Sequence, residues 1–153
     1  MATYWRISNH TDLSGEGGRY ASSRWHSRGS RIVFLAESPA AALCEVLVHL
    51  ECDMEAIPDS HTLLKISAPD ALPVHLIDPT ELSDWHSNER GTRSLGDGWL
   101  RSCATVLARV PSAVVPYTWN YLLNPAHPEA LQLQIVESCR EKCDSRLFRF
   151  EPR

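Results

Sequence analysis

Residues 31–50 constrain the fold of this chain more than any other segment, because they predict a buried strand that leads directly into a helix. Residues 31–36 (RIVFLA) form a continuous apolar run, which is typical of a strand covered on both faces. Ser38 is placed to cap the helix, with Pro39 at its first position. The apolar stripe of this helix has the spacing i, i+3, i+4, i+7, at Leu43, Val46, Leu47 and Leu50.

The remaining segments predict further strands and helices, without the regular alternation of a βαβ sheet. The expected strands are Thr3–Ile7, His61–Ser67, Val74–Ile77, Ser112–Val115 and Leu131–Val136. The expected helices are Asp78–Trp85, with Asp78 as N-cap, and Leu100–Val110, which Pro111 ends. The glycine-rich segment Asn88–Gly98 is expected to be a mobile connection. Short strands mixed with a few helices favour the α+β class.

Length and composition indicate one soluble domain that spans residues 1–153. Hydrophobic residues make up 43% of the chain and charged residues 22%, close to the averages of globular proteins. No apolar run is as long as a membrane span, and residues 1–10 lack the pattern of a secretory signal. We therefore expect a cytoplasmic protein with no membrane partner. The glycine motifs of Rossmann and P-loop nucleotide sites are also missing.

The cysteines and histidines do not follow metal-binding patterns. The five cysteines include no C-x-x-C pair, and we expect them to be mostly buried thiols. The seven histidines lie far apart in the sequence, without ligand spacing. We therefore expect neither a metal nor a prosthetic group. The cysteines are Cys44, Cys52, Cys103, Cys139 and Cys143.

Positive charge is concentrated near the N-terminus of an acidic chain. Residues 1–36 hold five arginines against two acidic residues, net +3, and the remainder holds 10 basic against 17 acidic residues, net −7. Ser8–Ser30 is predicted to be a long loop, and its residues Tyr20 and Trp25 argue against disorder. Such an arginine cluster suits a small anionic ligand, whereas a nucleic-acid binder would be basic throughout. The alternative is a solvated, arginine-rich loop.

One set of polar residues is a candidate active site. Each member has a plainer alternative: a surface ion pair for the arginine, a solvated helix position for the glutamate, and turn formation for the serine and asparagines. The residues alone leave both interpretations open. The set consists of Arg6, Glu45, Ser112, Asn120 and Asn124.

Six segments in order resemble one known family over nearly the whole chain. They read WRIS, LSGEG, SRWHSRGSRIVFLAESPAAALCEVLVHL, VPSAVVP, NYLLNPAHP and CDSRLF. Together they resemble the RES domain, the toxin component of RES-Xre type II toxin–antitoxin systems. The family is named for an Arg, a Glu and a Ser, which fall here on Arg6, Glu45 and Ser112.

The resemblance implies a fold and an activity. The fold is similar to that of ADP-ribosyltransferases, with short mixed or antiparallel sheets, flanking helices and a central cleft that binds NAD. NAD is then a substrate, and the activity is growth arrest through cleavage of its ribose–nicotinamide bond. The first alternative is an ADP-ribosyltransferase that modifies a specific cellular protein. The second is a non-catalytic module that binds a nucleotide or a partner.

The resemblance also implies roles for the polar residues. Glu45 is expected to stabilise an oxocarbenium-like transition state. Arg6 is expected to bind the pyrophosphate through its bidentate fork, with Arg24 or Arg19 in support. Ser112 is expected to donate a hydrogen bond to a phosphate or a ribose hydroxyl, without acting as a nucleophile.

Five further residues complete the expected ligand contacts. Tyr20 or Trp25 would offer the nicotinamide ring a flat face. Asn120 is expected to contact the ligand. His26 and Phe34 stand where the family usually has Asn and Tyr, so the ligand contacts at these two positions differ from the usual ones.

A partner protein follows from the same resemblance. The family implies a cognate antitoxin with a DNA-binding Xre-like domain, and an acidic segment of it could pair with Arg6 or Arg24. The alternative is an antitoxin that binds elsewhere, for instance on the acidic C-terminal half. The chain itself is not expected to bind nucleic acid, and the sequence leaves a homodimer open.

Overall fold

The computed structural model describes residues 1–49 and 59–148, and within them it contains helices and one mixed β-sheet. This confirms the predicted α+β class. The helices are α1 (Pro39–His49) and α2 (Glu89–Ser102), with 3-10 helices η1 (Glu16–Arg19), η3 (Pro128–Gln132) and η4 (Ser145–Phe148). The strands are β1 (Ala2–Ile7), β2 (Val33–Ala36), β3 (Ser60–Ala68), β4 (Val74–Leu76), β5 (Leu107–Pro111), β6 (Trp119–Leu123) and β7 (Gln134–Lys142).

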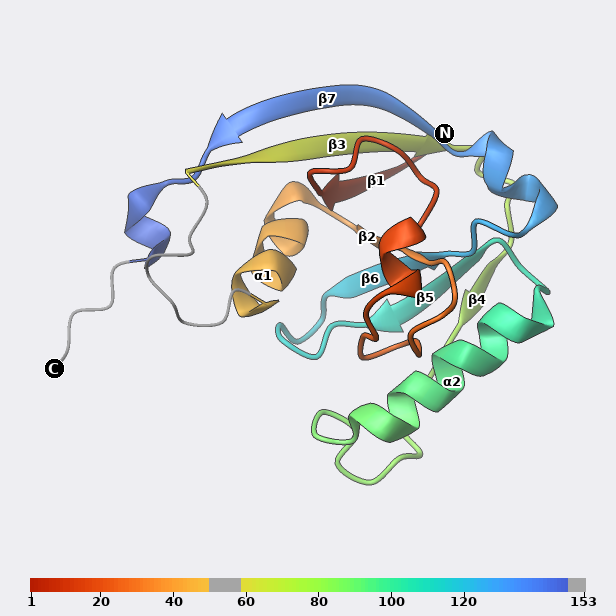
Figure 1. Cartoon of the computed structure of the whole chain (residues 1–153). Helices are drawn as coiled ribbons and strands as arrows, with labels where there is room; N and C mark the ends of the chain where they lie inside the picture. Colours follow the sequence, from red (N-terminus) through yellow and green to blue (C-terminus); the bar gives the residue numbers. More distant parts are fainter. Residues whose placement is uncertain (50–58, 149–153) are drawn as a thin grey trace, which may run out of the picture.

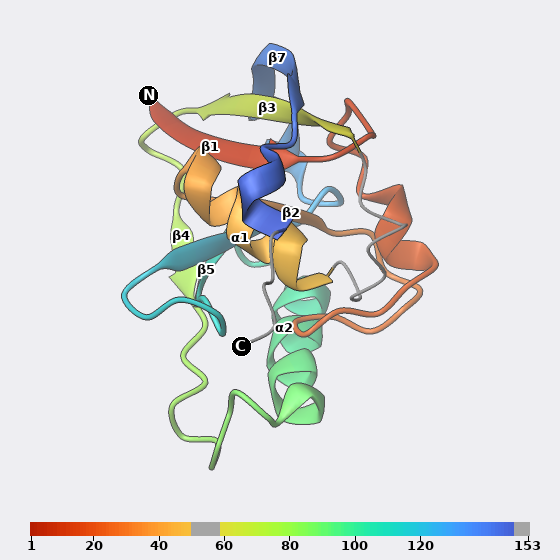
Figure 2. The same cartoon turned by 90° about the vertical axis from the view of Figure 1, so that its left-hand side faces the viewer.

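The sheet consists of two halves that meet at β1 and β2. Its strand order is β4-β5-β6-β2-β1-β3-β7, and among the strands of the described residues only the β4–β5 pair is parallel. β1 pairs with β3 over six residues, but with β2 through the single register pair Trp5↔Ala36. The half with β1, β3 and β7 lies at one end of the molecule, and α2 lies at the opposite end (Figures 1 and 2). The short sheets that the resemblance implied are thus two halves of one sheet.

Two hydrophobic clusters hold the two halves of the sheet and α2 together. The first joins the two halves of the sheet, because it contains Leu64 and Ile66 of β3 together with Leu35 of β2 and Leu123 of β6. The second packs α2, through Trp99, against the other half of the sheet. Buried residues alternate along β3, as expected for a strand with one face in the core. The site described below lies where the two halves meet.

The region around α2 corrects two sequence predictions. Asn88–Gly98 is largely helical, because Asn88 caps α2 through a 2.9 Å bond from the backbone N–H of Gly91. The predicted helix Leu100–Val110 is wrong: α2 ends at Ser102, and Leu107–Pro111 is strand β5. β5 lies between β4 and β6 and is largely buried, and a short apolar run of this kind reads equally well as helix or strand.

Three further segments differ from the prediction or match it only in part. Asp78–Trp85 forms turns instead of a helix, and the Asp78 carboxylate accepts from the backbone N–H of Thr80. Ser112–Val115 is a bend instead of a strand. Leu131–Val136 is only partly strand, since η3 extends to Gln132 before β7 begins. The other predicted strands and the helix from Pro39 are confirmed, while Leu50 lies outside the described residues.

The cysteine prediction is wrong for the described residues. Cys139 is exposed, and Cys44, Cys103 and Cys143 are partly buried. Cys52 lies outside the described residues. Within residues 1–49 and 59–148, no helix is long and apolar enough to cross a bilayer.

Candidate active site

A cavity of about 1080 Å³ lies where the two halves of the sheet, α1 and the long N-terminal loop come together. Its volume is at the upper end of the range for small-molecule sites. Arg6 comes from one half of the sheet, and Phe34 and Asn120 come from the other. The lining contains these predicted residues: Arg6, Arg24, Trp25, His26, Phe34, Glu45 and Asn120.

Glu45 of α1 is an acid of this cavity that side chains from two distant segments hold in place. Its Oε1 accepts from Ser112 Oγ at 2.9 Å and from Asn120 Nδ2 at 2.8 Å. No donor among residues 1–49 and 59–148 bonds to its other oxygen, Oε2. Two donors on one oxygen fix the carboxylate plane and leave the second oxygen available to a ligand.

Ser112 orients Glu45 and is itself held by the backbone. Its Oγ accepts from the N–H groups of Val114 and Val115, each at 3.1 Å. With both hydroxyl lone pairs occupied, the single O–H must donate to Glu45. Ser112 is 6% exposed and is not among the cavity-lining residues, so the structure places it behind Glu45. The predicted contact of Ser112 with the ligand is therefore replaced by a contact with the carboxylate.

Asn120 reaches the same carboxylate from β6. The strand is paired on both sides, with Ala36 of β2 and Val110 of β5 opposite Asn120, so its position is fixed by two ladders. Its Nδ2 donates to Glu45, while its buried Oδ1 has no partner among the described residues. The amide orientation follows from chemistry, since turning it over would place an oxygen against the carboxylate.

Arg6 brings a positive charge to the cavity from the end of β1. Its Nη1 donates to the backbone carbonyl of Asp12 at 2.7 Å, which fixes the guanidinium against the loop. Burial lowers the pKa of Arg6, and the Asp12 carboxylate partly opposes that shift. The group remains charged at neutral pH because an arginine pKa starts so high.

His26 holds the loop together through both ring nitrogens. Nε2 lies 3.0 Å from the Gly18 carbonyl, and Nδ1 lies 2.6 Å from Ser23 Oγ. Because the carbonyl can only accept, Nε2 carries the proton and Nδ1 accepts from the serine hydroxyl. The side chain is 1% exposed. Both ring nitrogens of His26 are therefore bonded within the protein, although His26 lines the cavity.

The aromatic residues of the loop are arranged only in part as predicted. Trp25 lines the cavity, but it is 5% exposed and packs with Trp99 in the second hydrophobic cluster. Tyr20 is 76% exposed and is not among the lining residues. Phe34 lines the cavity and is 40% exposed, and its ring lies 5.7 Å from that of His26. Phe34 is thus an exposed aromatic ring in the cavity wall, which Trp5 and Trp25 also line.

Two other predicted residues lie elsewhere. Arg19 is exposed, forms an ion pair with Glu16 at 3.4 Å and does not line the cavity. Asn124 is buried behind α2, where its Nδ2 donates to the Leu100 carbonyl at 3.3 Å. Arg19 and Asn124 therefore have structural roles, as the alternatives of a solvated arginine-rich loop and of turn-forming asparagines suggested.

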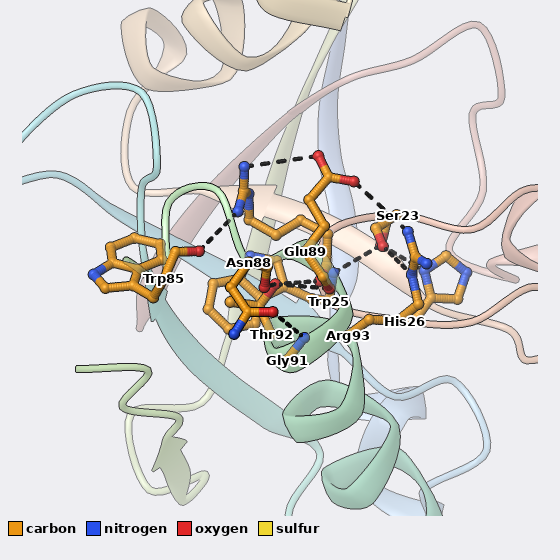
Figure 3. Close-up of polar contacts among 10 residues, drawn as sticks. Ser23, Trp25, His26, Trp85, Asn88, Glu89, Gly91, Thr92 and Arg93 are labelled. Atoms are coloured by element: carbon orange, nitrogen blue, oxygen red, sulfur yellow. Dashed lines mark hydrogen bonds and ion pairs between the residues drawn. The ribbon is translucent and has the colours of Figure 1, made fainter. Parts of the chain in front are cut away.

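Sequence analysis missed the contribution of α2. Glu89 and Arg93 line the cavity beside Arg24, and they come from the segment predicted to be a mobile connection. Figure 3 shows how α2 contacts the loop, where Arg93 Nε donates to the Ser23 carbonyl at 2.9 Å. Thr92 Oγ1 also donates to the Arg24 carbonyl at 2.8 Å. The only signal in the sequence was the Asn88 cap before a stretch with helical charge spacing.

The described residues contain no cluster that suits a metal ion. Within residues 1–49 and 59–148, no three His, Cys, Asp or Glu side chains come together as ligands would. The polar groups that line the cavity include the fixed carboxylate of Glu45 and the guanidinium groups of Arg6, Arg24 and Arg93. This combination suits a ligand with phosphate groups and a carbon centre that becomes positive.

Comparisons with known proteins agree with this picture. A family model described as the RES domain matches residues 3–146. A protein named Toxin Res, from Pseudomonas putida, is 46% identical over 145 residues, which cover 94% of this chain and 98% of that protein. A protein named Prs ADP-ribosylating toxin, from Sphingobium sp., is 33% identical over 158 residues, which cover 96% and 97%.

A solved structure shares the fold. A chain of the M. tuberculosis MbcT–MbcA toxin–antitoxin complex aligns with a TM-score of 0.71 at 20% identity, over 95% of this chain and 86% of that chain. The two sequences differ greatly, so this likeness concerns the fold. The family model and the identity to Toxin Res each span nearly all of the sequence. The chain therefore belongs to the RES domain family, as its sequence segments indicated.

Proposed function

We propose that this protein is the toxin of a toxin–antitoxin system and cleaves the ribose–nicotinamide bond of NAD. The observation that carries the proposal is the Glu45 carboxylate, fixed at one oxygen by Ser112 and Asn120 in the wall of a large, arginine-bearing cavity. Membership of the RES family and the relatives named Toxin Res support the toxin role.

Cleavage of the ribose–nicotinamide bond requires one carboxylate. When the bond between C1′ of the ribose and the nicotinamide nitrogen breaks, its electron pair goes to the pyridinium ring, and nicotinamide leaves as a neutral molecule. The ribose carbon becomes oxocarbenium-like, and the charge of Glu45 stabilises it more strongly than it stabilises the ground state. Water then adds to C1′ and loses a proton, which gives ADP-ribose. No general acid is required for the leaving group.

The other cavity residues would bind and orient the dinucleotide. We expect Arg6 to bind the pyrophosphate, since among the described residues only its Nη1 is bonded, to the Asp12 carbonyl. Phe34 offers an apolar ring to a base or to nicotinamide. Ser112 and Asn120 act through Glu45 as positioning residues.

Transfer of ADP-ribose to a protein is the second candidate. It is favoured by the Sphingobium relative, whose name states that it is an ADP-ribosylating toxin. The purified protein should be incubated with NAD, with and without cell extract, while free nicotinamide and ADP-ribose are measured. Release without extract supports hydrolysis, and label transferred to protein only with extract supports transfer. If neither occurs, the chain is a binding module.

A test in cells addresses the toxin role. Expression of the chain alone is expected to arrest growth and to lower cellular NAD, and co-expression of an Xre-like antitoxin is expected to restore both. If the antitoxin occludes the cavity, it competes with NAD for binding. A complex that binds NAD with undiminished affinity would place the antitoxin elsewhere, and harmless overexpression of the folded chain would contradict the toxin role.

Replacing Arg6 with Lys tests the pyrophosphate contact. Lysine keeps the charge but loses the planar fork, so we expect kcat/KM for NAD to fall by about 30-fold or more, nearly as far as in Arg6→Ala. Nicotinamide release gives the rate. Arg19→Lys is the matched control, because Arg19 is exposed outside the cavity. Full activity in Arg6→Lys would remove Arg6 from this role.

A further inference from the structure

Two arginines share one carboxylate at the part of the cavity formed by α2. Glu89 Oε1 lies 3.8 Å from Arg24 Nη2, and Glu89 Oε2 lies 3.8 Å from Arg93 Nη2. Both distances are longer than a charge-assisted hydrogen bond, for which about 2.8 Å is typical. Two guanidinium groups against one carboxylate leave this cluster with a net positive charge.

The two guanidinium groups are held in place by backbone carbonyls. Arg93 Nε donates to the Ser23 carbonyl at 2.9 Å (Figure 3). Arg24 Nη1 donates to the Trp85 carbonyl at 3.4 Å. These bonds use one N–H group of each arginine, and within residues 1–49 and 59–148 the terminal nitrogens nearest Glu89 have no short partner. The forks are therefore fixed by the fold before any ligand binds, which lowers the entropy cost of binding.

The exposed fractions of the three side chains indicate that Glu89 is the one that a bound anion can displace. Arg24 and Arg93 are 23% and 30% exposed, whereas Glu89 is 60% exposed. A carboxylate in contact with water loses little when an anion replaces it beside the arginines. The guanidinium groups are more buried, so a bound anion attracts them more strongly than it would attract surface arginines.

We propose that Arg24 and Arg93 form a phosphate-binding subsite, and that Glu89 limits its affinity by partly neutralising it. The proposal rests on the proposed function for the identity of the ligand, a dinucleotide whose reacting ribose lies at Glu45. The phosphate is either the diphosphate of the dinucleotide or a phosphate on the 2′-oxygen of its adenosine ribose. In the second case, Glu89 sets the preference between NAD and NADP.

Removing the Glu89 charge is the most direct test. Glu89→Gln keeps the size of the side chain and raises the cluster from one net positive charge to two. We expect it to tighten phosphate binding by about fivefold, and this gain should shrink at high salt. Damage to α2 would weaken binding, so the sign of the change separates the proposed role from a structural one.

The experiment uses titration calorimetry of the full chain at low and high salt. The probes are ADP, adenosine 2′,5′-bisphosphate and AMP, which lacks both the diphosphate and the 2′-phosphate. The matched control is Glu137→Gln on β7, because Glu137 is 68% exposed, pairs with Lys65 and does not line the cavity. Arg93→Gln is expected to weaken phosphate binding by about tenfold.

Each outcome has one meaning for the subsite. Tighter binding of ADP by Glu89→Gln, relative to AMP, assigns the subsite to the diphosphate. Tighter binding of the 2′,5′-bisphosphate assigns it to the 2′-phosphate. A Glu89→Gln protein that binds both probes like the Glu137→Gln control, or more weakly, overturns the proposal.

The subsite and the NAD-cleaving activity can fail separately. If the wild-type chain does not cleave NAD but Glu89→Gln still tightens phosphate binding, only the proposed function fails. If the wild-type chain cleaves NAD and Glu89→Gln changes no affinity, only the subsite fails.

Discussion

Glu45→Gln is expected to lower kcat for NAD cleavage by about a thousandfold or more, while the melting temperature and NAD affinity stay close to wild type. The glutamine carbonyl can take the place of Oε1 and accept from Ser112 and Asn120, so the local geometry is retained. Only the negative charge is lost, and that charge acts mainly in the transition state. Nicotinamide release, calorimetry with NAD and thermal unfolding measure the three quantities.

Controls separate the charge of Glu45 from its positioning. Ser112→Ala and Asn120→Ala each remove one donor to Oε1, and we expect each to lower kcat by about tenfold. In cells, Glu45→Gln should relieve the growth arrest. If Glu45→Gln raised KM but left kcat unchanged, Glu45 would be a binding group rather than a catalytic one.

Gly96→Ala is expected to destabilise the protein by more than about 3 kcal/mol. A Cβ atom at Gly96 would overlap the backbone carbonyl oxygen of Trp25 and lie 2.6 Å from its carbonyl carbon. Both are backbone atoms of the loop that lines the cavity, so either the loop or α2 must move. Chemical denaturation measures the free energy of unfolding, and NAD cleavage should fall along with it.

Gly98→Ala is the matched control in the same helix. Nothing lies within 4 Å of a Cβ atom at Gly98, and alanine favours the helix by up to about 1 kcal/mol over glycine. The two alanine variants should therefore change stability in opposite directions. If Gly96→Ala were as stable as Gly98→Ala, the close contact between α2 and the loop would not form in solution.

Local patterns in the sequence predicted the elements that lie early in the chain. The apolar run before Ser38 and the cap at that residue correctly gave β2 and α1. The predicted helix was wrong over residues 103–110, because pairing with distant strands decides the structure there. Leu107–Pro111 is a strand since β6 and β4 pair with it, and no window of neighbouring residues contains that information.

The candidate site was only partly predictable, because its geometry also depends on contacts between distant segments. The family resemblance gave Arg6, Glu45 and Ser112, and the structure brings the latter two into contact across 67 residues of sequence. The resemblance did not show that Ser112 lies behind the carboxylate, because that depends on which donors bond to the Ser112 hydroxyl oxygen. Arg93 was missed because its role depends on α2, which the glycines of its sequence concealed.

The single register pair between β1 and β2 has a consequence for the cavity. One pair of residues cannot fix the angle between the two halves of the sheet, so the side chains packed between them must do so. Tyr4 of β1 packs edge-on against Tyr121 of β6, with ring centroids 4.8 Å apart. We expect such residues to set the distance between the two halves of the sheet, and with it the width of the cavity. Ligand affinity in this protein should therefore respond to the volume of core side chains that never touch the ligand.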